Sequence, residues 1–239
     1  MFVPFHDRNP LRHIRHAYVT RAIVVVNVLI FLFYQHAGAE DATLASVVSF
    51  GLIPSTLTGV HIRPDTAFGL AEPLTLVTYS FLHADFWHLA GNMLFLWVLG
   101  DNVEDATGHL RFVLFYLLCV VGGGLAHVFA LPGSDAALIG ASGGVAGVIA
   151  AYLLLHPRVR IWVLLLFRFP LPLPTFVVLG FWVLWQIWMI AFGPADDVSW
   201  VTHMGGLATG ALAILVLKRR GVPLFARDDA LVVPPAVVD

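Results

Sequence analysis

The sequence Ile139-Gly140-Ala141-Ser142-Gly143-Gly144-Val145-Ala146-Gly147 places one hydroxyl among four glycines at the start of an apolar segment. A glycine inside a helix costs roughly 1 kcal/mol relative to alanine, so this density of glycine indicates a need for bare backbone. The pairs Gly140/Gly144 and Gly143/Gly147 have the small-xxx-small spacing that lets membrane helices touch. We therefore expect a closely packed helix to begin here.

Ser142 is expected in the first turn of that helix. A helix N-terminus carries backbone N–H groups without intrahelical partners and the positive end of the helix dipole. This environment suits a nucleophile that generates an oxyanion. A membrane serine can instead hydrogen-bond to its own helix, which is the structural alternative for Ser142 taken alone.

The composition indicates that the chain is surrounded largely by lipid and not by water. Hydrophobic residues make up 59% and charged residues 12%, whereas soluble domains carry about 25% charged residues. We predict an all-α polytopic membrane protein in a lipid bilayer. The single cysteine, Cys119, excludes an internal disulfide and a cysteine-based metal cage, and we expect neither metal nor cofactor. A net charge of -2 with only one short basic run, 218–220, argues against nucleic acid.

Six apolar segments predict a six-helix membrane domain over residues 19–217. A cytoplasmic arm (1–18) precedes it, and a cytoplasmic C-terminal tail (218–239) follows. The outer loop 37–85 is expected to be interfacial with short helices, and a polar turn is expected at 101–105, stabilised by Glu104. The predicted spans cover residues 18–35, 86–100, 110–131, 142–155, 173–192 and 200–217. Small residues at 37–39 also fit a signal-peptide cleavage site, although a retained first span is preferred.

The basic residues predict the orientation. All of them except Arg63 fall on one side of the six-span arrangement. By the positive-inside rule both termini are then cytoplasmic, and we expect a multi-pass protein of a bacterial plasma membrane.

Depth in the membrane can be estimated from the inner ends of spans 2, 4 and 6. At about 1.5 Å per residue, Ser142, His203 and His88 lie roughly 20, 21 and 18 Å above the inner edge. In a core about 30 Å thick they share one level, roughly 10 Å below the outer surface. Asn92 lies one helical turn from His88 on the same face. Because span 4 is short, the chain before Ser142 must enter as non-helical backbone covered by protein or water.

A serine near a histidine, with water and helix N-terminal donors, is the arrangement used for acyl transfer to water. His203 would take the proton of Ser142 and return it to the leaving amine. No carboxylate lies at the same predicted depth. We therefore predict a catalytic dyad without an acidic third member.

Several motifs in these spans resemble the signatures of rhomboid intramembrane serine proteases. The resemblance extends from about Pro54 to Leu217, with the motifs in the family's order on spans 2, 4 and 6. They are His88-Leu89-Ala90-Gly91-Asn92, Gly100 through Glu104, Gly140-Ala141-Ser142-Gly143, and His203-Met204-Gly205-Gly206 with Gly206 and Gly210 four residues apart.

The resemblance implies a six-helix bundle with Ser142 as nucleophile and His203 as base. It also implies that His88, Asn92 and the Ser142 amide bind the oxyanion. Substrates would be transmembrane proteins cut near their outer ends, with span 5 and the loop 193–199 acting as gate and cap. Helix packing would rest on six glycines: Gly140, Gly143, Gly144, Gly147, Gly206 and Gly210.

The chain departs from the family pattern at two places. Some members carry an aromatic residue four positions after the serine, thought to stack on the histidine, and Ala146 stands there. Some carry a Trp-Arg pair in the first outer loop, and residues 37–85 contain no tryptophan. The packing of His203 and the anchoring of the loop are therefore left open.

Three functions other than proteolysis also fit parts of this sequence. The G-x-S-x-G pattern also fits the nucleophile elbow of soluble hydrolases, but the alternating strands and helices of that fold are missing. A small transporter could use His88, Asn92 and His203 as a proton relay, yet no inverted repeat is visible. A catalytically inactive rhomboid-like protein that binds membrane clients would usually have lost the serine or the histidine, and both are present.

Overall fold

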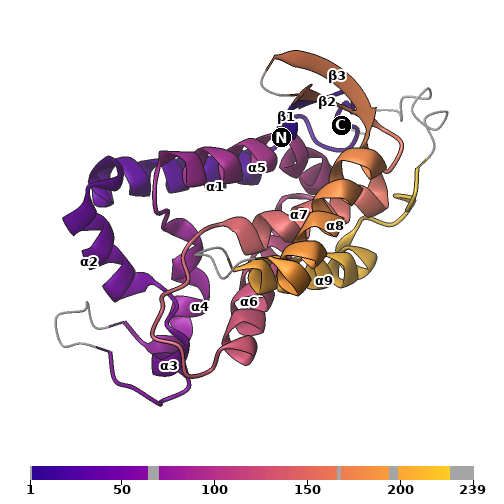
Figure 1. The fold of residues 1–239 in the computed structure, drawn as a ribbon. Helices are drawn as coiled ribbons and strands as arrows, with labels where there is room; N and C mark the ends of the chain where they lie inside the picture. The colour runs from indigo at the N-terminus through magenta and orange to yellow at the C-terminus, as the bar shows by residue number, and fades with distance from the viewer. Residues whose placement is uncertain (1, 64–69, 166–167, 194–198, 227–239) are drawn as a thin grey trace.

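The computed structural model describes residues 2–63, 70–165, 168–193 and 199–226 of the chain. It is mainly helical, as predicted, and its long helices pack together as a bundle (Figure 1). Each predicted span contains one long helix. These are α1 (Tyr18–Leu29, continued by a π-helical turn Ile30–Tyr34), α5 (Phe86–Thr107), α6 (His109–Ala130), α7 (Ser142–Leu155), α8 (Thr175–Phe192) and α9 (Trp200–Leu217).

The outer faces of this bundle are apolar. Among the described helices, α6, α8 and α9 are long and apolar enough to cross a membrane, and α7 and the segment Tyr18–Tyr34 are shorter apolar helices. Large side chains such as Leu110, Phe129 and Val216 are at least 82% exposed. Exposed apolar surface on helices of membrane-spanning length is typical of proteins embedded in a lipid bilayer. The protein is therefore an integral membrane protein.

The outer loop contains the short helices that the sequence predicts. They are α2 (Glu40–Phe50), α3 (Pro54–Leu57) and α4 (Thr75–Thr78), with 3-10 turns at His36–Gly38, Glu72–Leu74 and Tyr79–Phe81. Helices α2 and α3 lie at the end of the molecule away from the strands (Figure 1).

Arg63 anchors this loop from within. Its guanidinium donates to both carboxylate oxygens of Glu72 at 2.8 Å, and to the backbone carbonyls of Val48 and Gly51. The Arg63 side chain is 7% exposed. A bidentate arginine pair fixes geometry as well as charge. Arg63, the one lysine or arginine expected on the outer side, thus holds parts of the outer loop together. This loop is therefore anchored without the tryptophan that some family members carry.

A three-stranded antiparallel sheet, which the sequence did not reveal, covers the other end of the bundle. Its order is β1 (Phe2–Asp7), β2 (Arg160–Leu165), β3 (Phe169–Pro174). Strand β1 pairs with β2 from Phe2 opposite Leu165 to Asp7 opposite Ile161. The prolines of β3 suit an edge strand, because proline cannot donate to a second neighbour. The strands lie beside the end of α5 (Figure 1).

A partly buried hydrogen bond joins β1 to α7 and predicts a pH dependence of stability. The hydroxyl of Tyr152 donates to Asp7 Oδ2 at 2.5 Å. Burial raises the pKa of Asp7 from its ordinary 3.8 to about 6. The ionised carboxylate therefore costs stability, and this cost grows as the pH rises from about 4 to 6 and is constant above.

Asp7→Asn is expected to remove this pH dependence, since the amide oxygen still accepts the Tyr152 bond but never ionises. In thermal unfolding in detergent between pH 4 and pH 8, the wild type should lose stability relative to Asp7→Asn as the pH rises to 6. Curves that stay parallel over this range would contradict the assignment.

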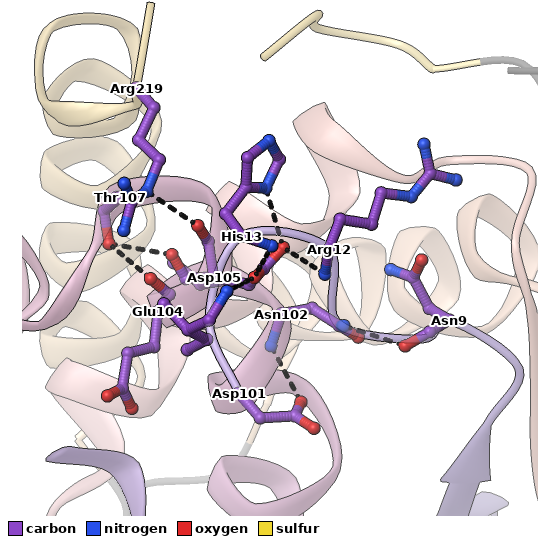
Figure 2. A network of polar contacts seen from close by, with 11 residues as sticks. Asn9, Arg12, His13, Asp101, Asn102, Glu104, Asp105, Thr107 and Arg219 are labelled. Carbon is purple, nitrogen blue, oxygen red and sulfur yellow. Dashed lines mark hydrogen bonds and ion pairs between the residues drawn. The ribbon is translucent and has the colours of Figure 1, made fainter. Parts of the chain in front are cut away.

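The prediction of a polar turn at 101–105 is wrong, because α5 continues through these residues to Thr107. The helix ends at Gly108, whose φ of +86° suits glycine. The Asp105 carboxylate accepts the backbone N–H groups of Arg12, His13 and Ile14 at 2.6 to 3.1 Å. Figure 2 shows the N-terminal arm folded around this carboxylate. Tertiary partners thus stabilise a polar helix end that would otherwise unwind.

The same network joins the arm to the segment after α9. Arg219 donates its backbone N–H to Ala106 at 2.7 Å and its Nε to the Asp105 carbonyl at 3.2 Å (Figure 2). Strands β1 and β2, the end of α5 and this segment therefore lie at one end of the molecule. The distribution of lysines and arginines in the sequence also predicts these segments on one side of the membrane.

Candidate active site

Ser142 is the first residue of α7, and α7 has the bounds that the sequence predicts. The preceding Ala141 has no side chain that could cap the helix. By helix geometry, the first backbone N–H groups of α7 then lack intrahelical acceptors. Ser142 itself is partly exposed.

The chain enters α7 as non-helical backbone enclosed by protein, as expected. Leu138 forms an isolated antiparallel bridge with Leu52, and the Gly140 N–H donates to the Tyr79 carbonyl at 3.0 Å. Leu138 is 8% and Ala141 0% exposed. The backbone polar groups before Ser142 thereby find protein partners at membrane depth.

Helices α7 and α9 touch backbone to backbone. A Cβ on Gly206 would overlap the Gly143 carbonyl oxygen, and one on Gly210 would lie 2.5 Å from the Gly147 Cα. Gly206 thus contacts Gly143, and Gly210, four residues later, contacts Gly147, four residues later. Because the contacts advance in the same direction along both helices, α7 and α9 run parallel in one fixed register. In this register Ser142 and His203 differ by two residues in level, or roughly 3 Å along the axis.

The remaining glycines of the serine motif also lie in close contacts. A Cβ on Gly144 would lie 2.7 Å from the Tyr116 ring of α6, and one on Gly147 would overlap Cys119 Sγ. Gly140 has a φ of +116°, and a Cβ there would lie 2.6 Å from His88 Nε2. Side chains at these positions would separate α7 from its neighbours.

His88 reaches this region from the start of α5. The Asp85 side chain caps the helix by accepting the His88 N–H at 2.9 Å. The ring Nδ1 lies 3.4 Å from the Ala84 N–H, so the proton of a neutral ring lies on Nε2, which faces Gly140. The buried amide of Asn92 donates to the His88 carbonyl at 3.0 Å. The buried His83 ring packs edge-on against His88 at 5.1 Å.

His203 is 8% exposed and is held from α8 and the start of α9. Its Nδ1 lies 2.6 Å from Gln186 Oε1. The rings of Trp182 and Trp200 lie with their centroids 5.8 Å from the imidazole. His88 thus approaches the start of α7 at Gly140, and His203 lies on α9, the helix that packs against α7.

A comparison with known protein families matches the Rhomboid domain to residues 70–220, well over half of the chain. This chain belongs to the rhomboid family. Rhomboid protein 1, mitochondrial, of Saccharomyces cerevisiae is 30% identical over 150 residues, which cover 60% of this chain and 41% of the yeast protein. Rhomboid-related protein 1 of Caenorhabditis elegans is 30% identical over 199 residues, 79% of this chain and 52% of that protein.

A bacterial relative carries a protease name. Rhomboid protease GluP of Bacillus subtilis is 30% identical over 134 residues, which cover 56% of this chain and 24% of that protein. The chain spans about half or less of the length of the curated relatives it matches.

In this rhomboid, three residues that the sequence motifs do not indicate lie beside His203. Trp182 and Trp200 provide the aromatic contacts to His203 that Ala146 cannot make. Gln186 supplies a hydrogen-bond acceptor for the His203 ring. Gln186 could have been noticed as a polar interruption in an apolar span, a feature that marks functional candidates in membranes. Of the expected cap, 193–199, residues 194–198 lie outside the described residues.

Proposed function

We propose that this rhomboid is an intramembrane serine endopeptidase that hydrolyses peptide bonds in or near transmembrane segments of membrane proteins. The observation that carries the proposal is the fixed register of α7 and α9, which sets Ser142 and His203 at nearly one level. The bond of His203 Nδ1 to Gln186 leaves Nε2 available for the serine proton.

In the proposed reaction, Ser142 Oγ attacks the scissile carbonyl carbon while His203 Nε2 takes the hydroxyl proton. The carbonyl oxygen becomes an oxyanion, which accepts hydrogen bonds from the Ser142 N–H, the His88 Nε2–H and the Asn92 amide. His203 then gives its proton to the leaving amine. A water molecule, activated by His203, attacks the acyl-enzyme and restores the free serine.

The proposal extends to the substrate and the orientation. Substrates would be transmembrane proteins that approach α8 from the lipid bilayer, with six spans enclosing the site. Both termini and the strand end would lie in the cytoplasm, because that end carries the basic arm and Arg219. The site would then open to the extracytoplasmic side of a plasma membrane, and span 1 would be retained.

The test uses the purified full chain in liposomes with a single-span model substrate. Ser142→Ala and His203→Ala should each lower cleavage by at least about 10³-fold, because serine and histidine act as one unit. A fluorophosphonate should label the wild type and not Ser142→Ala.

Ser46→Ala is the matched control, since the partners of Ser46 Oγ within the described residues are carbonyls of its own helix. This variant should cleave like the wild type. Cleavage that persists in Ser142→Ala would overturn the assignment of the nucleophile. A folded wild type that neither cleaves nor labels would point to an inactive, client-binding rhomboid.

A further inference from the structure

Gln186 is a buried amide in the otherwise apolar second half of α8, and it is 1% exposed. Its Nε2 donates to the Trp182 carbonyl one turn earlier, at 3.1 Å. A carbonyl oxygen can only accept, so the NH2 group of the amide must face Trp182. The amide oxygen is therefore the atom that faces His203.

This orientation decides where the proton of His203 lies. Gln186 Oε1 can only accept a hydrogen bond, and it lies 2.6 Å from His203 Nδ1. Nδ1 must then carry the proton, which leaves the lone pair of a neutral ring on Nε2. An aspartate has this role in many serine proteases, where loss of the correct tautomer costs about 10⁴-fold in kcat.

The acceptor sits on the least buried of the three described helices that are long and apolar enough to cross a membrane. In α8, 28% of the residues are buried, against 33% in α9 and 50% in the most apolar stretch of α6. Phe181, Leu184 and Trp188 are 47% to 66% exposed on its outer face. The bond from Gln186 to His203 and the contact of Trp182 with the same ring join α8 to α9 beside the site. A shift of α8 would break both.

We propose that Gln186 is a positioning residue that fixes the tautomer of His203, and that it does so only while α8 is seated against α9. The proposal rests on the proposed function, in which His203 is the general base. According to this proposal, the protonation pattern that lets His203 act as a base depends on the position of α8, whose outer face is apolar and exposed.

The tautomer can be observed without any substrate. In the full chain with ¹⁵N-labelled histidine, the His203 signals are identified by their loss in His203→Ala. The wild type should show a protonated Nδ1 and an unprotonated Nε2, and Gln186→Met should show both tautomers. A His203 spectrum that does not change in Gln186→Met would overturn the proposal, whether or not the protein cleaves.

Kinetics separate positioning from packing. Gln186→Met keeps the side-chain length without a strong acceptor, and kcat should fall roughly 10- to 100-fold with KM changed less than about threefold. Gln186→Glu restores an acceptor, so activity should recover, and the acid limb of the pH profile should move to higher pH because a carboxylate stabilises the imidazolium. The other histidine of the proposed site, His88, is unchanged in both variants.

Leu179→Ala is the packing control, since Leu179 is fully buried on α8 and bonds to no catalytic group. It should lower thermal stability and leave the pH profile unchanged. Failure of this inference differs from failure of the proposed function. If Ser142→Ala abolishes cleavage while Gln186→Met and Gln186→Glu keep the wild-type pH profile, the positioning role is wrong and the protease assignment stands.

Discussion

Gly210→Ala is expected to be among the most destabilising single substitutions in this rhomboid. The added Cβ would lie 2.5 Å from the Gly147 Cα and closer still to its carbonyl oxygen. These atoms belong to the backbone of α7, so no flexible side chain can move aside. Overpacking of this kind costs about 1 to 3 kcal/mol, and a contact with rigid backbone belongs at the upper end.

Activity should fall with stability in this variant, because the α7–α9 register sets Ser142 against His203. Thermal unfolding in detergent and cleavage of the model substrate measure the two effects. Gly180→Ala is the matched control: Gly180 lies in α8 and a Cβ there would meet nothing within 4 Å. It should be neutral or stabilising by up to about 1 kcal/mol. Equal stability of the two variants would contradict the close α7–α9 contact.

Glu104→Ala is the second substitution with a large expected effect. The Glu104 side chain is 0% exposed, and its carboxylate accepts the backbone N–H groups of Val19 and Thr20 at 3.0 and 2.8 Å. It also accepts from the Thr20 hydroxyl at 2.7 Å and lies 2.5 Å from His109 Nδ1. A residue of α5 thus satisfies the first turn of α1, which its own N-cap residue, Ala17, does not.

Removal of this carboxylate leaves several buried donors unpaired. Breaking one side of such a buried charged network costs about 3 to 5 kcal/mol, so Glu104→Ala should unfold at a clearly lower temperature or denaturant concentration. Glu40→Ala is the control, because Glu40 is an exposed carboxylate at the start of α2. It should change stability by less than about 1 kcal/mol. Release of α1 from α5 should be visible as faster amide exchange at Val19 and Thr20.

The start of α7 could be read from the sequence because its signals are local. A glycine-rich turn, a serine and an uninterrupted apolar run predict a helix from Ser142 to Leu155, and the structure has these bounds. Glycines spaced four residues apart likewise predict close helix contacts. The sequence also predicts short helices in the outer loop, but their bounds come from the structure.

The end of α5 and the sheet could not be read in this way. Residues 101–105 are polar and suggest a turn, yet partners from residues 12–20 keep them helical. Strand β1 pairs with β2 from the other half of the chain, and no local pattern predicts such a partner. Long-range pairing of this kind overrides local propensity.

That this chain is a helical membrane protein with rhomboid motifs, and that Ser142 begins a helix, can be inferred from its residues alone. These properties depend on composition and on neighbours within one or two turns. The surroundings of His203 depend instead on how the helices pack. Gln186 and Trp182 come to it from α8, since distant side chains meet only after the helices have packed.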